Sequence, residues 1–391
     1  MDKKKELQVL YIVTQLELGG AQKVCLALLN GMPSHNVKTF LIAGAHGPLV
    51  KEVEANPQVE LLPELHQRKK INNILHEIKC FFTLIHKVRA LKKKHPNIIV
   101  HTHSSKAGFF GRWAAFFAGV KTRIHTVHGY AFHPHTPWPF WLIVYSCELI
   151  SSIITTHFIC VSSHDVKTGI RTLPGFTHKY SIIRAAVDYH TFYQPARTVA
   201  IPPKRPFIFG SISCFKTQKN VFDLLKAFAH VHQLNPNTRL EIIGDGLLRP
   251  ALEQWIDKHQ LDHAITLHGW QEEVHPIMQT WHTFVISSLW EGLPCAIVEA
   301  RILKLPIITY DTGGITDIVF HRVNGLIVPQ KKWRILASDM FSLTHDHQLF
   351  SAISAYPDKL HDFISEHMTS QHYALYRRII KRSLPRNMTK K

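Results

Sequence analysis

The sequence has few cysteines, and none of them belongs to a C-x-x-C pair. The six are scattered singly along the 391 residues, at positions 25, 80, 147, 160, 214 and 295. Such spacing argues against a structural zinc site and against a small domain held together by disulfides. Isolated cysteines are typical of a reducing compartment, so we expect a cytoplasmic protein.

Acidic residues are also scarce. The chain carries 28 Asp and Glu against 46 Lys and Arg, which gives a formal net charge of +18 and a pI of about 9.6. This excess attracts nucleic acid and anionic membrane alike. Charge alone favours a nucleic-acid partner, and because no nucleic-acid-binding module is visible we expect none. Hydrophobic residues make up 45% of the chain, enough for a large core, which excludes a disordered protein.

Long uninterrupted hydrophobic runs are missing as well. The one candidate for a membrane span is 138–160, which contains Glu148 and His157 and is interrupted by Ser and Thr. We expect a helix followed by a strand there. The apolar run near residue 10 is only about six residues long, too short for the core of a signal peptide, and predicts the first buried strand.

Much of the positive charge lies between His66 and His95, where nine Lys and Arg accompany a single acid, Glu77. Apolar residues recur at helical spacing from Ile71 to Val88, so this segment is predicted to be an amphipathic helix with a cationic face. Two interpretations stay open: contact with anionic lipid headgroups, or an ordinary surface helix of a globular domain.

Apolar runs of strand length alternate with helical patterns along the whole chain, which predicts an α/β protein with parallel sheets and helices on both faces. The candidate strands are 9–13, 39–43, 97–103, 123–128, 157–162, 181–184, 207–212, 239–244, 265–269, 283–288 and 306–310. The pattern restarts after the proline-rich stretch 198–206, a natural linker. We therefore expect two doubly wound, Rossmann-like domains, about 1–195 and 205–365, with binding chemistry at the carboxyl ends of their strands.

Gly19 and Gly20 follow the first predicted strand and open a helix. Glycines there let the backbone approach a ligand, and a helix N-terminus attracts anions. The pair lacks the G-x-G-x-x-G spacing, which argues against a nicotinamide enzyme. As an isolated signal it is equally compatible with a simple turn.

Two carboxylates flank a turn in the second half. Glu291 and Glu299 are eight positions apart, with Gly292 and Pro294 between them. With a helix beginning near Leu293, Glu299 is expected about two turns inside it, too far from Glu291 for an acid/base pair. The two are better placed to accept hydrogen bonds from separate hydroxyls of one ligand, while the N–H groups of 293–296 face an anion. A nucleotide-sugar has this pattern; a capped helix with surface acids is the alternative.

The segment EGLPCAIVEA (291–300), followed by KLPIIT and NGLIVP, resembles the C-terminal signature of the family-4 retaining glycosyltransferases of GT-B fold, also called group 1 glycosyltransferases. Other parts match in order, and the end of the chain resembles the closing helix that crosses back to the N-terminal domain. These parts are LELGGAQ (16–22), 101–115, 125–133, 210–220, 242–253 and 363–376. The resemblance implies two domains facing a central cleft, an acceptor-binding domain at 1–195, a nucleotide-sugar-binding domain at 205–365, and a final helix and basic tail at 366–391.

The resemblance also implies roles for single residues. Glu291 would contact the hydroxyls of the donor sugar, Glu299 the ribose, and Lys219, with Lys216 nearby, the diphosphate. His128 would lie beside the sugar at the reacting face. The donor-binding turn would be Gly292, Leu293, Pro294 and Cys295, with Gly19 and Gly20 against the phosphates.

Two positions depart from the family pattern. Cys214 stands where an arginine is usual, and a thiol cannot donate to phosphate as a guanidinium does. The segment 184–188 lacks the usual Asn-Gly but keeps Asp188. His101 and His103 alternate along a strand end, but no third ligand has suitable spacing, so we expect no metal.

The resemblance implies a metal-independent retaining hexosyltransferase that uses a UDP- or GDP-linked sugar. Its acceptor would be a lipid-linked glycan of lipopolysaccharide, O-antigen or capsule assembly, at the inner face of the membrane. Two alternatives stay open: a GT-B sugar-nucleotide epimerase, and a nucleotide-binding homologue weakened at Cys214.

Overall fold

The computed structural model describes residues 6–65, 74–194 and 206–383, and the chain divides into two compact units. The first unit contains 1–186 and 362–391, and the second contains 187–361. The predicted boundaries were 1–195, 205–365 and 366–391. Of the predicted linker 198–206, all but Pro206 lies outside the described residues.

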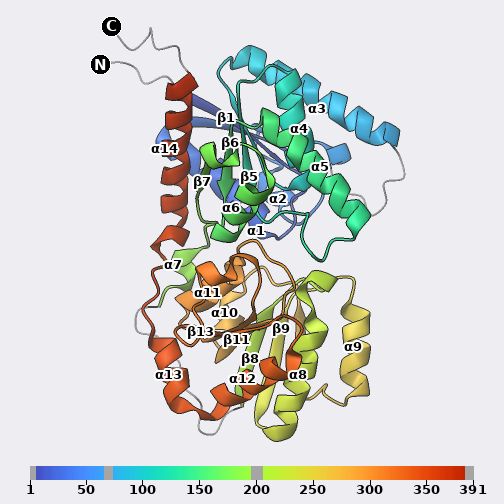
Figure 1. Ribbon diagram of the computed structural model, residues 1–391, viewed down its shortest axis with the longest axis vertical. Coiled ribbons are helices and arrows are strands. Elements are labelled where there is room, and N and C mark those ends of the chain that lie inside the picture. The colour runs from blue at the N-terminus through green and yellow to red at the C-terminus, as the bar shows by residue number, and fades with distance from the viewer. Residues whose placement is uncertain (1–5, 66–73, 195–205, 384–391) are drawn as a thin grey trace. The chain divides into compact units, whose positions relative to one another are not determined.

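The first unit contains a seven-stranded, fully parallel sheet in the order β3-β2-β1-β4-β5-β6-β7 (Figure 1). The strands are β1 (Leu7–Val13), β2 (Val37–Ala43), β3 (Val59–Leu61), β4 (Ile99–Thr102), β5 (Thr122–Val127), β6 (His157–Cys160) and β7 (Tyr180–Ile182). The helices are α1 (Gly20–Gly31), α2 (Val50–Val53), α3 (Ile74–Lys94), α4 (Ser105–Phe117), α5 (Trp138–Ile154), α6 (Ser163–Thr172) and α14 (Ser365–Ser383).

The core of the first unit forms where apolar β1 and β4 side chains meet α3 and α4. Leu10, Val100, Leu84 and Ala114 are fully buried together, and each large aliphatic side chain so buried contributes about 1.5–3 kcal/mol. The final helix α14, red in Figure 1, packs on α1. The segment that the sequence analysis expected as a closing helix thus groups with the first unit.

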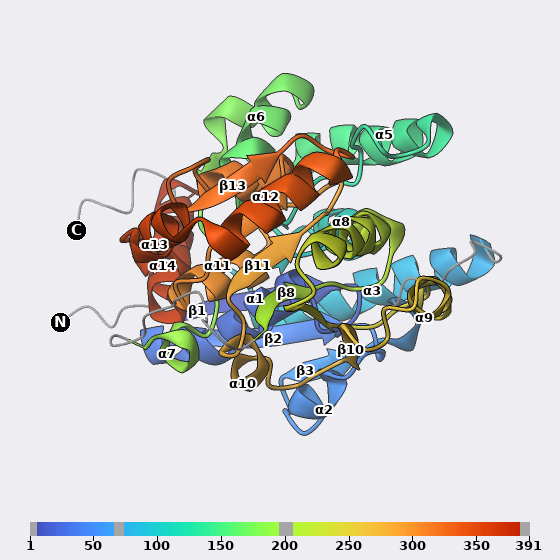
Figure 2. The same ribbon diagram turned by 90° about the horizontal axis from the view of Figure 1, so that it is seen from below.

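The second unit contains a six-stranded parallel sheet in the order β10-β9-β8-β11-β12-β13. Its strands are β8 (Phe207–Ile212), β9 (Thr238–Ile243), β10 (Ile265–Gly269), β11 (Thr283–Ile286), β12 (Ile307–Tyr310) and β13 (Gly325–Val328). Its helices are α7 (Tyr189–Phe192), α8 (Val221–Leu234), α9 (Arg249–Lys258), α10 (His275–Met278), α11 (Cys295–Ile302), α12 (Trp333–His345) and α13 (His347–Ala355). Figure 2 shows α8 and α12, which contact each other, beside β11.

Each predicted strand is present, and the α/β class with two doubly wound sheets is confirmed. The sequence prediction missed β3 and β13, which are short and begin or end at turns. The run 138–160 forms helix α5 followed by strand β6, as predicted. Helix α3 confirms the amphipathic helix over 74–94, whereas 66–73 lies outside the described residues. Within the described ranges, no helix combines the length and apolarity that crossing a bilayer requires.

Candidate active site

In both units, the order of the strands reverses beside the first strand, and the loops at the carboxyl ends of the two central strands diverge there. Such switch points are where open α/β sheets bind ligands. In the second unit, the switch point lies between β8 and β11. The two loops that leave these strands carry most of the predicted donor-binding residues.

Lys219 and Glu291 lie on these two loops and form an ion pair. The Nζ of Lys219 is 2.5 Å from Oε1 of Glu291, and their side chains are only 19% and 8% exposed. The N–H of Leu289 donates to the carbonyl of Gln218 at 2.8 Å, which ties the loops together. The hydroxyl of Ser287 donates to the carbonyl of Asn220 at 2.9 Å. The sequence placed both residues at the donor, and the structure brings them into contact across 72 residues of chain.

The loop after β12 fixes the backbone of Glu291. Gly313 has φ of +52°, and a Cβ added there would lie 1.9 Å from the carbonyl oxygen of Glu291. The N–H of Gly314 donates to the carbonyl of Gly292 at 2.9 Å. Only glycine at 313 permits this approach, because any side chain would push the Glu291 loop away.

Helix α11 begins at Cys295 rather than near Leu293, because Pro294 still has an extended backbone (φ −76°, ψ 104°). Glu299 therefore lies about one turn inside the helix, and the predicted two turns are wrong. Leu293 is buried in the turn before the helix, while Glu299 is partly buried. No side chain caps the N-terminus of α11, so its first N–H groups supply the positive end of the helix dipole beside Glu291.

The segment around Cys214 contacts the loop after β9. The N–H of Phe215 donates to the carbonyl of Asp245 at 2.8 Å, and Gly244 has φ of +132°, where a Cβ would lie 2.1 Å from the carbonyl of Ser213. Cys214 is partly exposed and Lys216 is exposed. The sequence prediction gave no role to Arg249 on this loop system. Its guanidinium lies 3.1 Å from Asp245 and 2.7 Å from Glu253, so two carboxylates offset its charge.

The first unit brings together three strand ends. Gly19 is the N-cap of α1 after β1, as predicted, and Gly20 is its first residue. His103 follows β4, and its N–H donates to the carbonyl of Ile12 at 2.8 Å, beside the end of β1. His128 follows β5, the next strand in the sheet. All of them lie at the carboxyl edge of the first sheet.

A buried cluster of histidines and tyrosines surrounds His128. The Nδ1 of His103 lies 3.1 Å from Nε2 of His128. His101 bonds through Nδ1 to the hydroxyl of Tyr376 and through Nε2 to the hydroxyl of Thr126, both at 2.7 Å. With both ring nitrogens engaged, His101 is not available as a metal ligand. We name His101, His103, His125, His128, His372, Tyr11 and Tyr376 the histidine cluster.

Burial keeps the histidine cluster neutral. Desolvation, and secondarily the nearby His372, lowers the pKa of His128 to about 3. Burial and the neighbouring imidazoles likewise hold the pKa of His101 and His103 well below the ordinary value. His128 is therefore a neutral imidazole, which donates one hydrogen bond from its protonated nitrogen and accepts one at the other.

The hydrogen bond between His103 and His128 also fixes a tautomer. The Nε2 of His103 is buried and has no hydrogen-bond partner among the described residues. An unpaired acceptor costs less than an unpaired N–H, so we assign the proton to Nδ1 of His103, which donates to Nε2 of His128. The proton of His128 then lies on Nδ1, opposite the bond to His103.

Helix α14 supplies part of this cluster. Its His372 and Tyr376 are four positions apart and so share one face of the helix, and Tyr376 is the residue that reaches His101. The sequence prediction matched this segment as a closing helix but assigned no role to either side chain. The spacing H-x-x-x-Y was the available signal.

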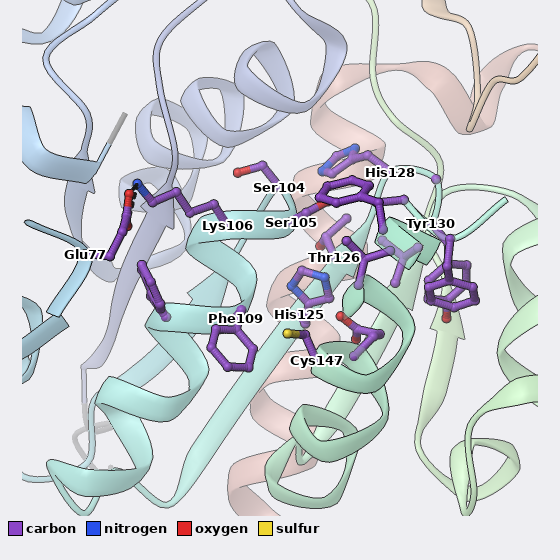
Figure 3. Close-up of a pocket in the computed structure, with 18 residues that line it drawn as sticks. Glu77, Ser104, Ser105, Lys106, Phe109, His125, Thr126, His128, Tyr130 and Cys147 are labelled. Carbon is purple, nitrogen blue, oxygen red and sulfur yellow. Dashed lines mark hydrogen bonds and ion pairs between the residues drawn. The ribbon is translucent and has the colours of Figure 1, made fainter. Parts of the chain in front are cut away.

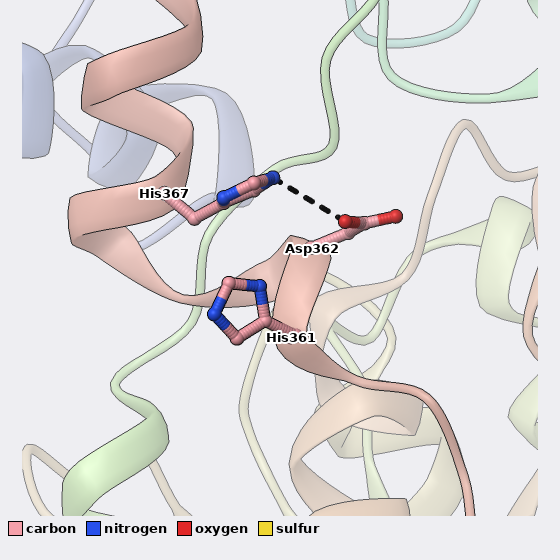
Figure 4. A group of neighbouring side chains, drawn as sticks. All are labelled: His361, Asp362 and His367. Carbon is pink, nitrogen blue, oxygen red and sulfur yellow. Dashed lines mark ion pairs between the residues drawn. The ribbon is translucent and has the colours of Figure 1, made fainter.

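Figure 4 shows the start of the same helix, where Nε2 of His367 lies 3.3 Å from Oδ1 of Asp362. His361 precedes them in the chain. Asp362 is 62% exposed, so the pair is weak. We assign no metal to these side chains.

A cavity of about 500 Å³ opens beside His128 within the first unit (Figure 3). It lies between α4, the loop after β5 and α5, and several aromatic rings line it. The lining includes Phe109, Phe110, Tyr130, Phe132 and Phe140, with Ser104, Ser105, Lys106 and Glu77 at one side. The sequence analysis did not predict this cavity.

Two family models match the chain. The Glycosyltransferase Family 4 model matches 18–191, and the Glycosyl transferases group 1 model matches 195–359.

Among curated proteins, the chain is 29% identical over 332 residues to the Escherichia coli UDP-Gal:alpha-D-GlcNAc-diphosphoundecaprenol alpha-1,3-galactosyltransferase, covering 83% of this chain and 84% of that protein. It is 24% identical over 324 residues to the putative glycosyltransferase EpsF of Bacillus subtilis, covering 78% and 79%.

Among solved structures, the Anabaena protein Alr3699/HepE in complex with UDP and glucose has a TM-score of 0.78 at 17% identity, covering 95% of this chain and 100% of that one. This likeness supports the GT-B fold. Together with the two family models, it shows that the chain belongs to the group 1, family-4 glycosyltransferases.

Proposed function

We propose that the protein transfers a hexose from a UDP-linked sugar to a lipid-linked glycan, with retention of anomeric configuration and without a bound metal. The ion pair of Lys219 and Glu291 at the second switch point carries this proposal. A cation and a carboxylate in contact offer one group for a diphosphate and one for sugar hydroxyls. UDP rather than GDP is favoured because relatives and fold neighbours are named with UDP or UDP-sugars.

The chemistry requires that negative charge be stabilised on the departing diphosphate. Lys219 and the uncapped N-terminus of α11 would supply that stabilisation, and preorganised donors of this kind are commonly the largest catalytic contribution. When the diphosphate arrives, Lys219 would exchange part of its contact with Glu291 for the phosphate, which frees the carboxylate for the donor hydroxyls. Glu299 would accept from the ribose.

Retention without a carboxylate nucleophile is consistent with attack by the acceptor on the face from which the diphosphate leaves. The proton of the acceptor hydroxyl would pass to the departing phosphate oxygen. His128, neutral and with its proton on Nδ1, would orient a sugar hydroxyl rather than act as a charged acid.

The E. coli relative, whose name specifies a GlcNAc-diphosphoundecaprenol acceptor, supports the lipid-linked acceptor. Relatives from capsule and colanic acid assembly support a role in cell-surface polysaccharide synthesis. Helix α3 would hold the protein at the anionic inner face of the membrane through its basic residues, each adding about 1 kcal/mol near the surface.

A transfer assay tests the proposal. Purified protein is incubated with radiolabelled UDP- and GDP-sugars and GlcNAc-diphosphoundecaprenol, and the anomeric configuration of the product is read by NMR. We expect a labelled lipid product with the configuration of the donor, in the presence of EDTA. A product of inverted configuration, or an isomerised sugar nucleotide without acceptor, would contradict the proposal, and the latter would indicate an epimerase.

Cys214 favours one alternative, a homologue that binds nucleotide-sugar without turnover. Under that alternative, UDP raises the unfolding temperature but no donor is consumed with any acceptor. Anionic vesicles test the membrane part separately: no sedimentation with them at low salt would contradict it.

A further inference from the structure

We infer that the cavity of the first unit binds the part of the acceptor lipid nearest its diphosphate, the first isoprene units of a polyprenyl chain. This inference rests on the proposed lipid-linked acceptor. The volume of the cavity, about 500 Å³, falls in the range of cavities that bind small molecules.

The wall of the cavity suits an unsaturated hydrocarbon. Phe109 and Phe110 come from α4, Phe132 from the loop after β5, and Phe140 and Val144 from α5. Phe132 is 5% exposed, whereas Phe140 is 49% exposed and marks the open end. A sugar buried among these rings would leave hydroxyls without polar partners, which costs free energy.

One side of the cavity is polar. Helix α4 begins there at Ser105, and Lys106 contacts Glu77 at 2.9 Å. Ser104 adopts φ of +61°, a strained backbone for serine, while its hydroxyl bonds to that of Thr14 at 2.6 Å. Strain of this kind is held in place by its surroundings and concentrates at functional sites. A diphosphate next to the isoprene units would meet this end.

Charge inside the cavity does not repel such a head group. Glu148 lines the cavity but is held by two hydrogen bonds of 2.7 Å from Arg112, which is fully buried. A bidentate pair of this geometry offsets the carboxylate charge. Lys106 and Glu77 offset each other in the same way until an anion competes for the lysine.

An orphaned hydroxyl gives an independent indication of a ligand. The phenolic oxygen of Tyr130 lines the cavity, is buried, and has no hydrogen-bond partner in the part of the chain that the structure describes. Figure 3 shows Tyr130 on the same loop as His128. Buried polar groups without partners are uncommon in folded proteins, and a phosphate or sugar oxygen of the acceptor would satisfy this one.

The surface outside the open end continues the apolar character. On α5, Trp138, Leu142 and Ile143 are 77%, 50% and 59% exposed. On α3, Ile74, Leu75 and Phe82 are 70%, 76% and 65% exposed. Exposed apolar side chains in such number mark a surface that meets lipid or another protein, and a polyprenyl chain leaving the cavity would run onto the apolar side chains of α5.

Calorimetry with farnesyl diphosphate tests the inference without donor or turnover. We expect binding by the full-length protein and much weaker binding of inorganic pyrophosphate and of farnesol, because each lacks one half of the ligand. Val144→Trp fills the cavity and is expected to weaken farnesyl diphosphate binding by about tenfold or more. Ile153→Trp, on the same helix but 78% exposed and not part of the cavity lining, is the matched control and should bind normally.

Tyr130→Phe keeps the test decisive if Val144→Trp does not fold. It removes one hydroxyl at constant shape and should weaken farnesyl diphosphate by about tenfold while leaving farnesol unchanged. Farnesyl diphosphate binding that survives in a folded Val144→Trp, or pyrophosphate binding as tight as farnesyl diphosphate, overturns the inference. If the protein glycosylates GlcNAc-diphosphoundecaprenol but does not bind farnesyl diphosphate, the inference is overturned and the proposed function stands. If it binds farnesyl diphosphate but transfers no sugar, the proposed function is contradicted and the cavity still binds a prenyl diphosphate.

Discussion

The two units share a doubly wound architecture but differ in the side chains they gather at the carboxyl edge of the sheet. The first unit gathers neutral imidazoles: His101 and His103 are fully buried, and the partly exposed His128 lies against His103. The second gathers opposite charges, Lys219 and Glu291. The same edge of the same fold therefore presents an uncharged hydrogen-bonding surface in one unit and an electrostatic one in the other.

This difference matches the division of work in a glycosyl transfer. A nucleoside diphosphate leaves with its charge growing, so its site needs fixed positive potential. An acceptor hydroxyl needs orientation without a charge that would hold it too tightly, which a neutral imidazole provides. Four experiments can break or sharpen the comparison.

Removal of the lysine should have the largest effect. Lys219→Met deletes the cation that we propose faces the diphosphate, and loss of one such donor is expected to lower kcat by about 10²–10³. It also leaves Glu291, only 8% exposed, without its partner, so the second unit should become less stable.

Stopped assays with the UDP-sugar substrate and thermal unfolding measure both effects. Lys226→Met is the matched control, because the Lys226 side chain is 44% exposed and its ion pair with Asp223 is longer, at 3.6 Å. Equal losses in the two variants would contradict a special role for Lys219.

Acid should destabilise the first unit more than the second. His128 and His372 have folded pKa values of about 3 and about 4, below the ordinary 6.5 of the unfolded chain. Between the folded and unfolded pKa values, the unfolded chain binds more protons than the folded protein. The free energy of unfolding is therefore highest above about pH 7 and decreases as the pH falls through 6.5. Each of the two residues costs about 1.4 kcal/mol at pH 5.5.

Hydrogen exchange followed by mass spectrometry at pH 7.5 and pH 5.5 resolves the two units. Strands β4 and β5 and helix α14 should lose protection first. Uniform loss across β8, β11 and α8 would show that the histidine cluster does not set the acid sensitivity.

The partner of His128 gives a smaller effect. His103→Phe removes the hydrogen bond that fixes the tautomer and should lower kcat about tenfold, the cost of one neutral hydrogen bond. His103→Gln, which retains a donor near the same place, should recover most of the rate. ¹⁵N NMR of His128 distinguishes positioning from packing: we expect Nδ1–H in the parent and a mixture of tautomers in His103→Phe. Equal rates for the Phe and Gln variants would contradict positioning.

Restoration of the family arginine should have the smallest effect. In Cys214→Arg the guanidinium would add a contact to the diphosphate beside Lys219 and lower the donor KM severalfold, since hydrogen bonds to charged groups contribute about 1.5–3 kcal/mol before the cost of ordering the side chain. Cys214→Lys is the comparison for charge without the planar fork. Turnover that begins only with arginine would identify the natural protein as the non-catalytic homologue.

Much of the fold was predictable because its strands are long apolar runs separated by helical periodicity. The missed strands show where that signal ends: β3 has three residues and β13 begins with Gly325, so neither offers a long apolar run. The start of α11 was predicted near Leu293, two residues early, because helix boundaries are uncertain by one or two residues, and Pro294 proved to be the cap.

The site was predictable where it depends on local motifs. Glu291 and Lys219 were identified from two separate segments, and each lies on the loop that follows its strand. The histidine cluster was not predicted, because a bond between His101 and Tyr376 joins residues 275 positions apart. Nothing local to either residue specifies such a pairing. The cavity was missed for the same reason, since its lining comes from four separate elements.

The return of the chain to the first unit at Asp362 has a consequence for biosynthesis. On the ribosome, 1–186 emerge well before α14, so the hydroxyl that Tyr376 presents to His101 is missing while the second unit is already being translated. The nascent first unit must wait for the last helix before Nδ1 of His101 gains this partner. The first unit therefore completes its folding only after the second unit has been translated. Tags or deletions near residue 376 would disturb the first unit, although most of that unit is synthesised first.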